Sequence, residues 1–338
     1  MKILVVGPSW IGDTVLAQPL LMLLHERHAE LHIDMLAPTW TLPLVQRMPE
    51  VRQAIASPFE HGELSLRERR SIGRALRGDG YDQAIVLPNT LKSAFVPLFA
   101  RIPRRTGYRG EMRWGTLTDM RILDERALPQ MAQRYAALAL DAGESLPAPL
   151  PTPHLEIDAA RRHSTLQTLG FTAAPRAVAL CPGAEYGPAK RWPPSYFAEL
   201  ARTLTRDGDD VWLIGAAKDA PIGEDIVRLS GGACVNLCGK TTLDQAIDLL
   251  ASARLVVTND SGLMHVAAAV GTPLVAVYGS STPQFTPPLS PRAAIVKLDM
   301  PCSPCFERTC PLGHFNCMMQ LKPDRVHAEA VRLLSAGD

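Results

Sequence analysis

The sequence predicts an α/β protein of two Rossmann-like, doubly wound domains that face a cleft. Three observations predict this fold class. Short β-branched runs alternate with longer amphipathic segments, a proline-rich stretch interrupts the alternation, and the alternation then begins again. Such alternation is typical of parallel sheets, and 338 residues suffice for two domains. Ligands of these sheets bind at the carboxyl ends of strands, so functional residues are expected in the loops that follow strands.

The first half opens with KILVVG, a β-branched run that ends in glycine, and two similar runs follow. Segments with leucines at helical spacing separate the first two of these runs. We expect strands over 2–7, 31–38 and 81–88, and helices over 14–28 and 64–78.

A connector is expected where residues 147–153 read PAPLPTP, with four prolines in seven residues. Proline favours an extended, semi-rigid chain over helix or strand. We therefore expect one domain over residues 1–150 and a second over residues 151–338.

The second half repeats the alternation. Most of its strand candidates are near-continuous apolar runs, as expected when helices cover both faces of a sheet. We expect strands over 177–183, 210–217, 235–239, 254–260, 272–279 and 293–298, and helices over 195–204, 242–253, 262–271 and 323–335.

Composition excludes several classes of protein. The 35 basic and 34 acidic residues give a net charge of +1, so no overall attraction to nucleic acid is expected. No apolar run reaches the roughly 18 residues that span a bilayer, and the first run lacks the features of a signal peptide. Seven cysteines, an odd number, argue against a disulfide scaffold. We expect a soluble cytoplasmic protein.

The loop after the first predicted strand reads GPSWIGDT. Its glycines have the spacing of a phosphate-binding loop, but Asp13 replaces the lysine that such a loop needs to meet phosphates. A carboxylate there suits a general base that acts on a substrate. The alternative is that Asp13 or Thr14 caps the following helix.

Two loops of the second half have the features of an anion site. Residues 182–193 combine two glycines with Lys190, a suitable point charge for a diphosphate; the alternative is a solvated surface loop. In the second loop, Gly262 allows close approach of a ligand to a helix N-terminus, and Asp260 suits sugar hydroxyls or orients the turn. His265 either meets a phosphate or packs, and Asp219 either accepts a ribose hydroxyl or is merely exposed.

Four segments together resemble the bacterial heptosyltransferases of glycosyltransferase family nine over essentially the whole chain. They are GPSWIGDTVLAQPLL, PGAEYGPAKRWP, NDSGLMHVAAAVGTP and CSPCFERTCPLGHFNCM. The resemblance implies a glycosyltransferase B-type fold that binds acceptor in the N-terminal domain and ADP-heptose in the C-terminal one. It also implies transfer of L-glycero-D-manno-heptose, with inversion and without a metal. The late cysteine segment favours the first heptose of the lipopolysaccharide inner core as acceptor.

The resemblance also implies roles for individual residues. Asp13 corresponds to the catalytic carboxylate and Lys190 to the diphosphate-binding lysine, with Asp219 near ribose and Thr241 near adenine. The other implied donor-site residues are Gly183, Glu185, Tyr186, Asp260, Ser261, Gly262, Leu263 and His265, and the expected acceptor contacts are Gly12, Lys92 and Arg109.

No cofactor is expected for catalysis, because Lys190 and helix amides can meet the leaving-group charge that a divalent metal could otherwise meet. A late cluster has C-x2-C-x4-C-x6-C spacing, which suits either a structural metal site, such as zinc, or reduced thiols. Its members are Cys302, Cys305, Cys310 and Cys317.

The expected partners are ADP-heptose and an anionic, lipid-linked inner-core acceptor. Arginines gather over 67–77 and 101–126, where they suit such an acceptor or a loose contact with the inner-membrane surface; the alternative is that they are solvated. Three other functions stay open: a heptosyltransferase with a different acceptor, a nucleotide-sugar epimerase and a non-catalytic nucleotide-sugar sensor.

Overall fold

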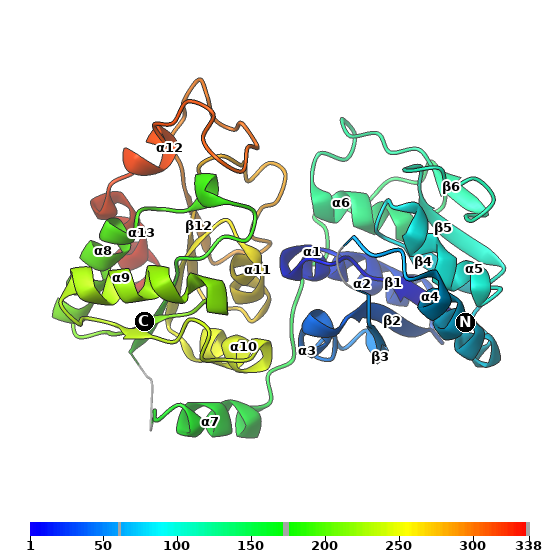
Figure 1. The fold of residues 1–338 in the computed structure, drawn as a ribbon, viewed down its shortest axis with the longest axis horizontal. Helices are drawn as coiled ribbons and strands as arrows, with labels where there is room; N and C mark the ends of the chain where they lie inside the picture. The colour runs from blue at the N-terminus through cyan, green and yellow to red at the C-terminus, as the bar shows by residue number, and fades with distance from the viewer. Residues whose placement is uncertain (60–61, 172–175, 336–338) are drawn as a thin grey trace. The chain divides into compact units, whose positions relative to one another are not determined.

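The computed structural model describes residues 1–59, 62–171 and 176–335, and it divides the chain into two compact units (Figure 1). Unit 1 is Met1–Pro153 and unit 2 is His154–Asp338. The division falls at the end of the proline-rich segment, close to the boundary expected after residue 150. No helix in the described ranges is long and apolar enough to cross a membrane.

Unit 1 is built on a six-stranded parallel sheet of order β3-β2-β1-β4-β5-β6. Its strands are β1 (Lys2–Val6), β2 (His32–Pro38), β3 (Val51–Ser57), β4 (Gln83–Val86), β5 (Arg104–Tyr108) and β6 (Asp119–Arg121). Its helices are α1 (Ile11–Leu16), α2 (Gln18–Arg27), α3 (Leu42–Val45), α4 (Leu66–Ala75), α5 (Phe95–Phe99) and α6 (Met131–Ala136).

Unit 2 has a second six-stranded parallel sheet, of order β12-β11-β10-β7-β8-β9. Its strands are β7 (Ala177–Cys181), β8 (Asp210–Leu213), β9 (Val235–Asn236), β10 (Leu255–Asn259), β11 (Leu274–Val277) and β12 (Ala293–Val296). Its helices are α7 (Ala159–Thr168), α8 (Pro194–Arg206), α9 (Ala220–Ser230), α10 (Leu243–Ser252), α11 (Gly262–Ala269), α12 (Asn316–Met319) and α13 (Pro323–Ser335).

The two sheets have the same topology. Numbered within its own unit, each sheet has strand order 3-2-1-4-5-6, which is the Rossmann order, so the predicted α/β class of two Rossmann-like units is confirmed. The order reverses between β1 and β4 in unit 1 and between β7 and β10 in unit 2. Ligands of such sheets bind outside the carboxyl ends of the strands that flank this reversal.

The cores explain why the central strands are stable. In β1, Ile3, Leu4 and Val5 are fully buried, and Val5 pairs in register with Met35 on one side and Ile85 on the other. Burial of each such side chain contributes about 1.5–3 kcal/mol relative to exposure. These buried strands fix the positions of the loops that follow them, where functional residues are expected.

One predicted helix is interrupted. The helix expected over 14–28 is two helices, α1 and α2, which meet at Ala17. Pro19 lies in the first turn of α2, where its missing N–H costs no hydrogen bond, whereas in the interior of one long helix it would remove a bond.

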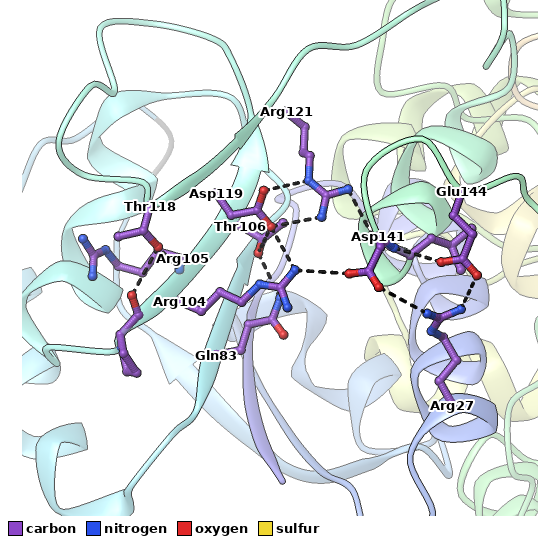
Figure 2. A network of polar contacts seen from close by, with 12 residues as sticks. Arg27, Gln83, Arg104, Arg105, Thr106, Thr118, Asp119, Arg121, Asp141 and Glu144 are labelled. Carbon is purple, nitrogen blue, oxygen red and sulfur yellow. Dashed lines mark hydrogen bonds and ion pairs between the residues drawn. The ribbon is translucent and has the colours of Figure 1, made fainter.

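A polar network ties the amino ends of three neighbouring strands in unit 1 (Figure 2). Asp119, the first residue of β6, accepts hydrogen bonds from Arg121 Nε at 2.8 Å and Thr106 Oγ1 at 3.0 Å, and Arg104 lies 3.2 Å away. These partners lower the pKa of Asp119 to about 2, chiefly through Arg121. The network lies at the edge of the sheet opposite to the expected site.

Candidate active site

The loop after β7 is held at both ends by Asn259, the last residue of β10. The Asn259 side chain donates to the carbonyl of Pro182 at 2.8 Å and accepts the N–H of Trp192 at 3.0 Å. Asn259 is fully buried, and the Trp192 indole donates to the carbonyl of Leu321 at 2.8 Å. The sequence did not single out Asn259 as a site residue, although its position at a strand end beside Asp260 was a signal.

Lys190 belongs to the short turn Pro188–Lys190 at the end of this loop, and its ammonium lies 2.6 Å from the carboxylate of Asp260. Asp260 is 4% exposed and also accepts the hydroxyl of Ser281 at 2.5 Å. The expectation that Asp260 orients its own turn was incomplete, because its carboxylate pairs with Lys190. Ser281 follows β11 at the same sheet edge and was missed, because two serines after a strand carry no distinctive motif.

The turn after β10 leads directly into α11. Ser261 has an extended backbone at the helix start, and its hydroxyl lies 3.4 Å from that of Thr258. Gly262 and Leu263 form the first turn of α11, whose amides lack partners within the helix and suit an anion.

His265 lies one turn into α11 and is 4% exposed. Burial lowers the pKa of His265 to about 4, although the neighbouring Asp260 opposes this shift. The imidazole is therefore neutral at pH 7, so it can offer a phosphate a hydrogen bond but no positive charge.

Asp219 is buried, with 4% exposure, so the alternative of an exposed acid was wrong. Its Oδ2 accepts the N–H of Ala216 at 3.0 Å. The carboxylate lies against Gly183, and a Cβ at that glycine would overlap it. Gly183 is thus the residue that allows the loops after β7 and β8 to approach each other.

Buried polar atoms without a partner concentrate in these loops. Six such side-chain atoms are found among the described residues. Four of them lie at this edge of the second sheet, in the loops or in the first turns of α11: Arg191 Nε, Asp219 Oδ1, His265 Nδ1 and Ser280 Oγ. Since each unpaired buried group costs about 1–3 kcal/mol, their concentration indicates a site completed by a polar ligand.

Two other predicted donor residues have protein partners. The Glu185 carboxylate pairs with Lys218, and the Tyr186 hydroxyl donates to the carbonyl of Phe306 at 2.5 Å. Thr241 is partly exposed between β9 and α10, at the same edge of the sheet.

In unit 1, Asp13 occupies the third position of α1. The residue at the N-cap position of this helix is Trp10, whose side chain does not cap the helix amides, and Thr14 Oγ1 donates to the Trp10 carbonyl at 2.9 Å. Trp10 therefore occupies the N-cap position, and Asp13 lies in the first turn of the helix, where an acid is favourable. Burial, and secondarily the Asp13 carboxylate, raises the pKa of the Tyr135 phenol.

The expected acceptor residues follow strands of the first sheet. Gly12 precedes Asp13 in α1, Lys92 lies in the turn Leu91–Ala94 after β4, and Arg109 follows β5. The Arg109 N–H donates to the carbonyl of Arg121 at 2.7 Å.

Arg113 was missed as a functional residue, because it looks like one more surface arginine in a basic segment. It is fully buried, and its guanidinium donates to the carbonyls of Pro88, at 2.8 Å, and Tyr108. It also donates to Asn89 Oδ1 at 3.3 Å. Arg113 therefore joins the loops after β4 and β5, which carry Lys92 and Arg109.

Among the described residues, no metal-binding group is found at the late cysteines Cys302, Cys305, Cys310 and Cys317, for which the sequence leaves a structural metal and reduced thiols open. All four thiols are free, and within the described ranges no three His, Cys, Asp or Glu side chains are grouped to hold a metal. Backbone N–H donors such as that of Phe315 lower the pKa of Cys310, whereas burial raises the pKa of Cys317.

The chain is similar to the proteins of one known family. The model of the family described as "Glycosyltransferase family 9 (heptosyltransferase)" matches residues 69–316. Lipopolysaccharide heptosyltransferase 2 of Escherichia coli is 46% identical over 343 residues and covers 99% of each chain. Lipooligosaccharide heptosyltransferase 2 of Haemophilus influenzae is 47% identical and covers 88% of this chain and 89% of its own.

A solved structure gives the same result. The structure of E. coli ADP-heptose lps heptosyltransferase II has a TM-score of 0.90 and 45% identity, and the match covers 100% of this chain and 99% of that one. Two Rossmann-like units with this similarity define a glycosyltransferase of the B-type fold. The chain belongs to glycosyltransferase family 9, the heptosyltransferases.

Proposed function

We propose that this enzyme transfers heptose from ADP-heptose to the first heptose of the lipopolysaccharide inner core, with inversion and without a catalytic metal. The observation that carries the proposal is the group of buried, unpartnered polar atoms around the Lys190–Asp260 pair. The names of the full-length relatives support the donor and the acceptor.

Residues of unit 2 bind the donor in this proposal. Lys190 and the first amides of α11 meet the diphosphate, and the neutral His265 adds a hydrogen bond. The free oxygen of Asp219 accepts a ribose hydroxyl, and Thr241 lies near adenine. Residues of unit 1, including Gly12, Lys92 and Arg109, meet the acceptor.

Asp13 acts as the general base. Its carboxylate takes the proton of the acceptor hydroxyl while that oxygen attacks the anomeric carbon of the heptose. The bond to ADP breaks on the opposite face, which inverts the configuration. Lys190 and the α11 amides stabilise the charge that develops on ADP, a role that a divalent metal fills in other enzymes.

ADP release tests this proposal. We expect the wild type with EDTA to release ADP from ADP-heptose only when the inner-core acceptor is present. Asp13→Ala should lower turnover by about 10²- to 10⁴-fold, the range for a positioned general base. Glu26→Gln, at an exposed acid of α2, is the control and should keep full turnover.

Other outcomes point to other functions. Release without acceptor would mean a hydrolase. Donor consumption without ADP release would indicate an epimerase, and donor binding without any reaction a sensor. Abolition of transfer by EDTA would contradict the metal-independent mechanism.

We also propose that the enzyme works at the cytoplasmic face of the inner membrane and contacts its surface. Leu64 and Leu66, 54% and 45% exposed, immediately precede the exposed arginines Arg67, Arg70 and Arg74. Apolar side chains beside arginines suit a surface of anionic lipids, and each cation near the surface contributes about 1 kcal/mol.

Vesicle sedimentation tests this contact. The wild type should sediment with vesicles that contain anionic lipid and stay in the supernatant with neutral vesicles. Replacing the three arginines by glutamine should abolish sedimentation, whereas the same change at Arg202, Arg228 and Arg332 of unit 2 should not. Equal sedimentation of all three proteins would contradict the proposed surface.

The sequence-based hypothesis also includes a structural metal, such as zinc, at the four late cysteines. Zinc binding there would require Cys317 to lose its proton against its raised pKa. Native mass spectrometry of the protein purified with zinc tests it: a mass increase of one zinc that is lost in Cys302→Ser would support the site, and the bare polypeptide mass would exclude it.

A further inference from the structure

The cysteine-rich segment 301–317 makes backbone contacts with the loop after β11. The N–H of Phe306 donates to the carbonyl of Ser280 at 2.7 Å, and the hydroxyl of Ser303 donates to the carbonyl of Gly279 at 2.6 Å. Ser280 carries one of the buried, unpartnered hydroxyls at the site. The segment therefore fixes the backbone of a loop that belongs to the donor site.

The same segment contacts the loop that carries Lys190. The Tyr186 hydroxyl donates to the carbonyl of Phe306 at 2.5 Å, and the N–H of Ala189 donates to the carbonyl of Arg308 at 3.0 Å. Gly187 allows this approach, because a Cβ there would overlap the backbone of Arg308. Residues 303–308 thus contact two loops whose contacted residues are 90 or more positions apart in the sequence.

These contacts place a second cation, Arg308, against the same Tyr186 ring that Lys190 contacts. The Lys190 ammonium lies 5.2 Å from the centre of the Tyr186 ring, and the Arg308 guanidinium lies 5.3 Å from the same centre. Arg308 is exposed, and in the described part of the chain no carboxylate lies within ion-pair distance of it.

The donor loops carry little net positive charge for a diphosphate, because two of their lysines have carboxylate partners. Lys190 is paired with the buried Asp260, and Lys218 is paired with Glu185, so each pair is neutral overall. Arg191 has no carboxylate partner among the described residues, and one of its nitrogens lies 3.4 Å from the carbonyl of Ala184 in its own loop. A diphosphate carries about two to three negative charges near neutral pH, so a second cation without a carboxylate partner, in addition to Arg191, would improve the charge balance.

We propose that Arg308 is a second diphosphate-binding residue, which the cysteine-rich segment 301–317 positions at the donor site. This inference rests on the proposed function. A guanidinium presents two parallel N–H donors that match phosphate oxygens. Its backbone bond to Ala189 and its contact with Tyr186 hold it in place before the ligand binds, which lowers the entropic cost of binding.

Calorimetry with ADP and with adenosine tests the proposal, because only ADP carries phosphate. Arg308→Gln should weaken ADP binding by about three- to tenfold, as expected for a charged hydrogen bond at a partly exposed site, and leave adenosine binding unchanged. Arg308→Lys keeps the charge but not the planar pair of donors, and its ADP affinity should lie between those of the wild type and Arg308→Gln. Arg228→Gln, at an exposed arginine of α9, is the control.

The outcomes separate this proposal from the one on which it rests. Unchanged ADP affinity in Arg308→Gln would overturn it, and so would an equal loss for ADP and adenosine, which would mean that Arg308 only supports the loop. If the wild type itself fails to bind ADP, the proposed function fails as well. If Arg308→Gln unfolds at a lower temperature than the wild type, the ADP affinity of Arg308→Lys is compared with that of the wild type instead. A lower affinity for ADP would support the proposal, and an equal affinity would overturn it.

Discussion

Lys190, the proposed diphosphate-binding residue, should also stabilise the fold through its ion pair with Asp260. Lys190→Ala leaves the buried Asp260 carboxylate without its cation, and only the Ser281 hydroxyl still donates to it. Because removing one partner of a buried pair leaves an uncompensated charge, we expect a loss of about 1–3 kcal/mol in the free energy of unfolding. ADP binding should also weaken. Urea unfolding and calorimetry measure the two effects separately.

The double variant Lys190→Ala/Asp260→Asn separates these roles. It removes both charges, so stability should largely recover while ADP affinity stays low. Lys297→Ala, which breaks an exposed pair with Asp299, should cost less than about 1 kcal/mol and serves as the control. Full recovery of ADP binding in the double variant would contradict a phosphate contact by Lys190.

His265 should make stability depend on pH. Its folded pKa of about 4 lies below the unfolded value near 6.5, so the unfolded chain takes up a proton first as the pH falls. The neutral form therefore stabilises the fold fully above about pH 6.5, and up to about 3 kcal/mol is lost as the pH falls toward 4.

The measurement is urea unfolding at several pH values between 7 and 4, for the wild type and His265→Asn. The difference between the two proteins should shrink as the pH falls. His163→Gln, at an exposed histidine of α7, should follow the wild type at every pH. A pH-independent difference between wild type and His265→Asn would show that His265 does not titrate in this range.

At the scale of elements, Asp119 shows how one carboxylate joins strands (Figure 2). Its pKa is lowered to about 2 by Arg121, Thr106 and Arg104, against 3.8 in the unfolded chain. Its ionised form therefore stabilises the fold above about pH 4, and this stability is lost as the pH falls toward 2. We expect Asp119→Asn to cost about 1–2 kcal/mol at pH 7, reduced for its 25% exposure, and almost nothing at pH 2.

Unfolding of Asp119→Asn in guanidinium chloride at pH 7 and pH 2 measures this loss. Glu329→Gln, which breaks an exposed pair with Arg332 on α13, should change stability by less than about 0.5 kcal/mol at both values. If the Asp119 variant is as stable as the wild type at pH 7, the network contributes nothing to the fold.

Arg113 should position the acceptor loops. Replacing it by methionine leaves the carbonyls of Pro88 and Tyr108 without their donor. We expect the KM for acceptor to rise about tenfold or more, with ADP affinity unchanged, because both loops belong to unit 1. Arg113→Lys should rescue little, since one ammonium cannot reproduce the planar set of donors. Equal effects on acceptor and ADP would indicate general destabilisation instead.

The sequence predicted long, apolar elements well and short or polar ones poorly. The buried β7 and β10 were expected, because their apolar runs are continuous. The edge strand β6 was missed, since three residues carry no periodic pattern, and β3 was missed because most of its residues are exposed or half-buried. The strand expected over 235–239 pairs only over Val235–Asn236.

At the scale of the whole molecule, the candidate site followed from topology, but its partners did not. The rule that ligands bind at the carboxyl ends of strands placed Lys190 and Asp260 at one sheet edge from sequence alone. Their ion pair joins residues 70 positions apart, and the Tyr186–Phe306 bond spans 120 positions. Local patterns carry no information about which side chains meet across such distances, so Ser281, Asn259 and Arg308 required the structure.

The division into two units predicts that donor affinity and turnover respond to different residues. Asp219 belongs to unit 2 and Asp13 to unit 1, and each unit has its own sheet. Asp219→Asn should weaken ADP binding by about tenfold, because a charged acceptor of a ribose hydroxyl is lost. Asp13→Asn should lower turnover without changing ADP affinity.

The double variant Asp13→Asn/Asp219→Asn tests this independence. Effects of residues that share no partner add, so its ADP affinity should equal that of Asp219→Asn alone, and its turnover at saturating substrates should equal that of Asp13→Asn alone. Calorimetry and steady-state kinetics supply the two values. A change in ADP affinity on replacing Asp13, in either background, would mean that Asp13 contacts or orders the donor. The base would then have a second role in donor binding, and the assignment of unit 1 to the acceptor alone would be wrong.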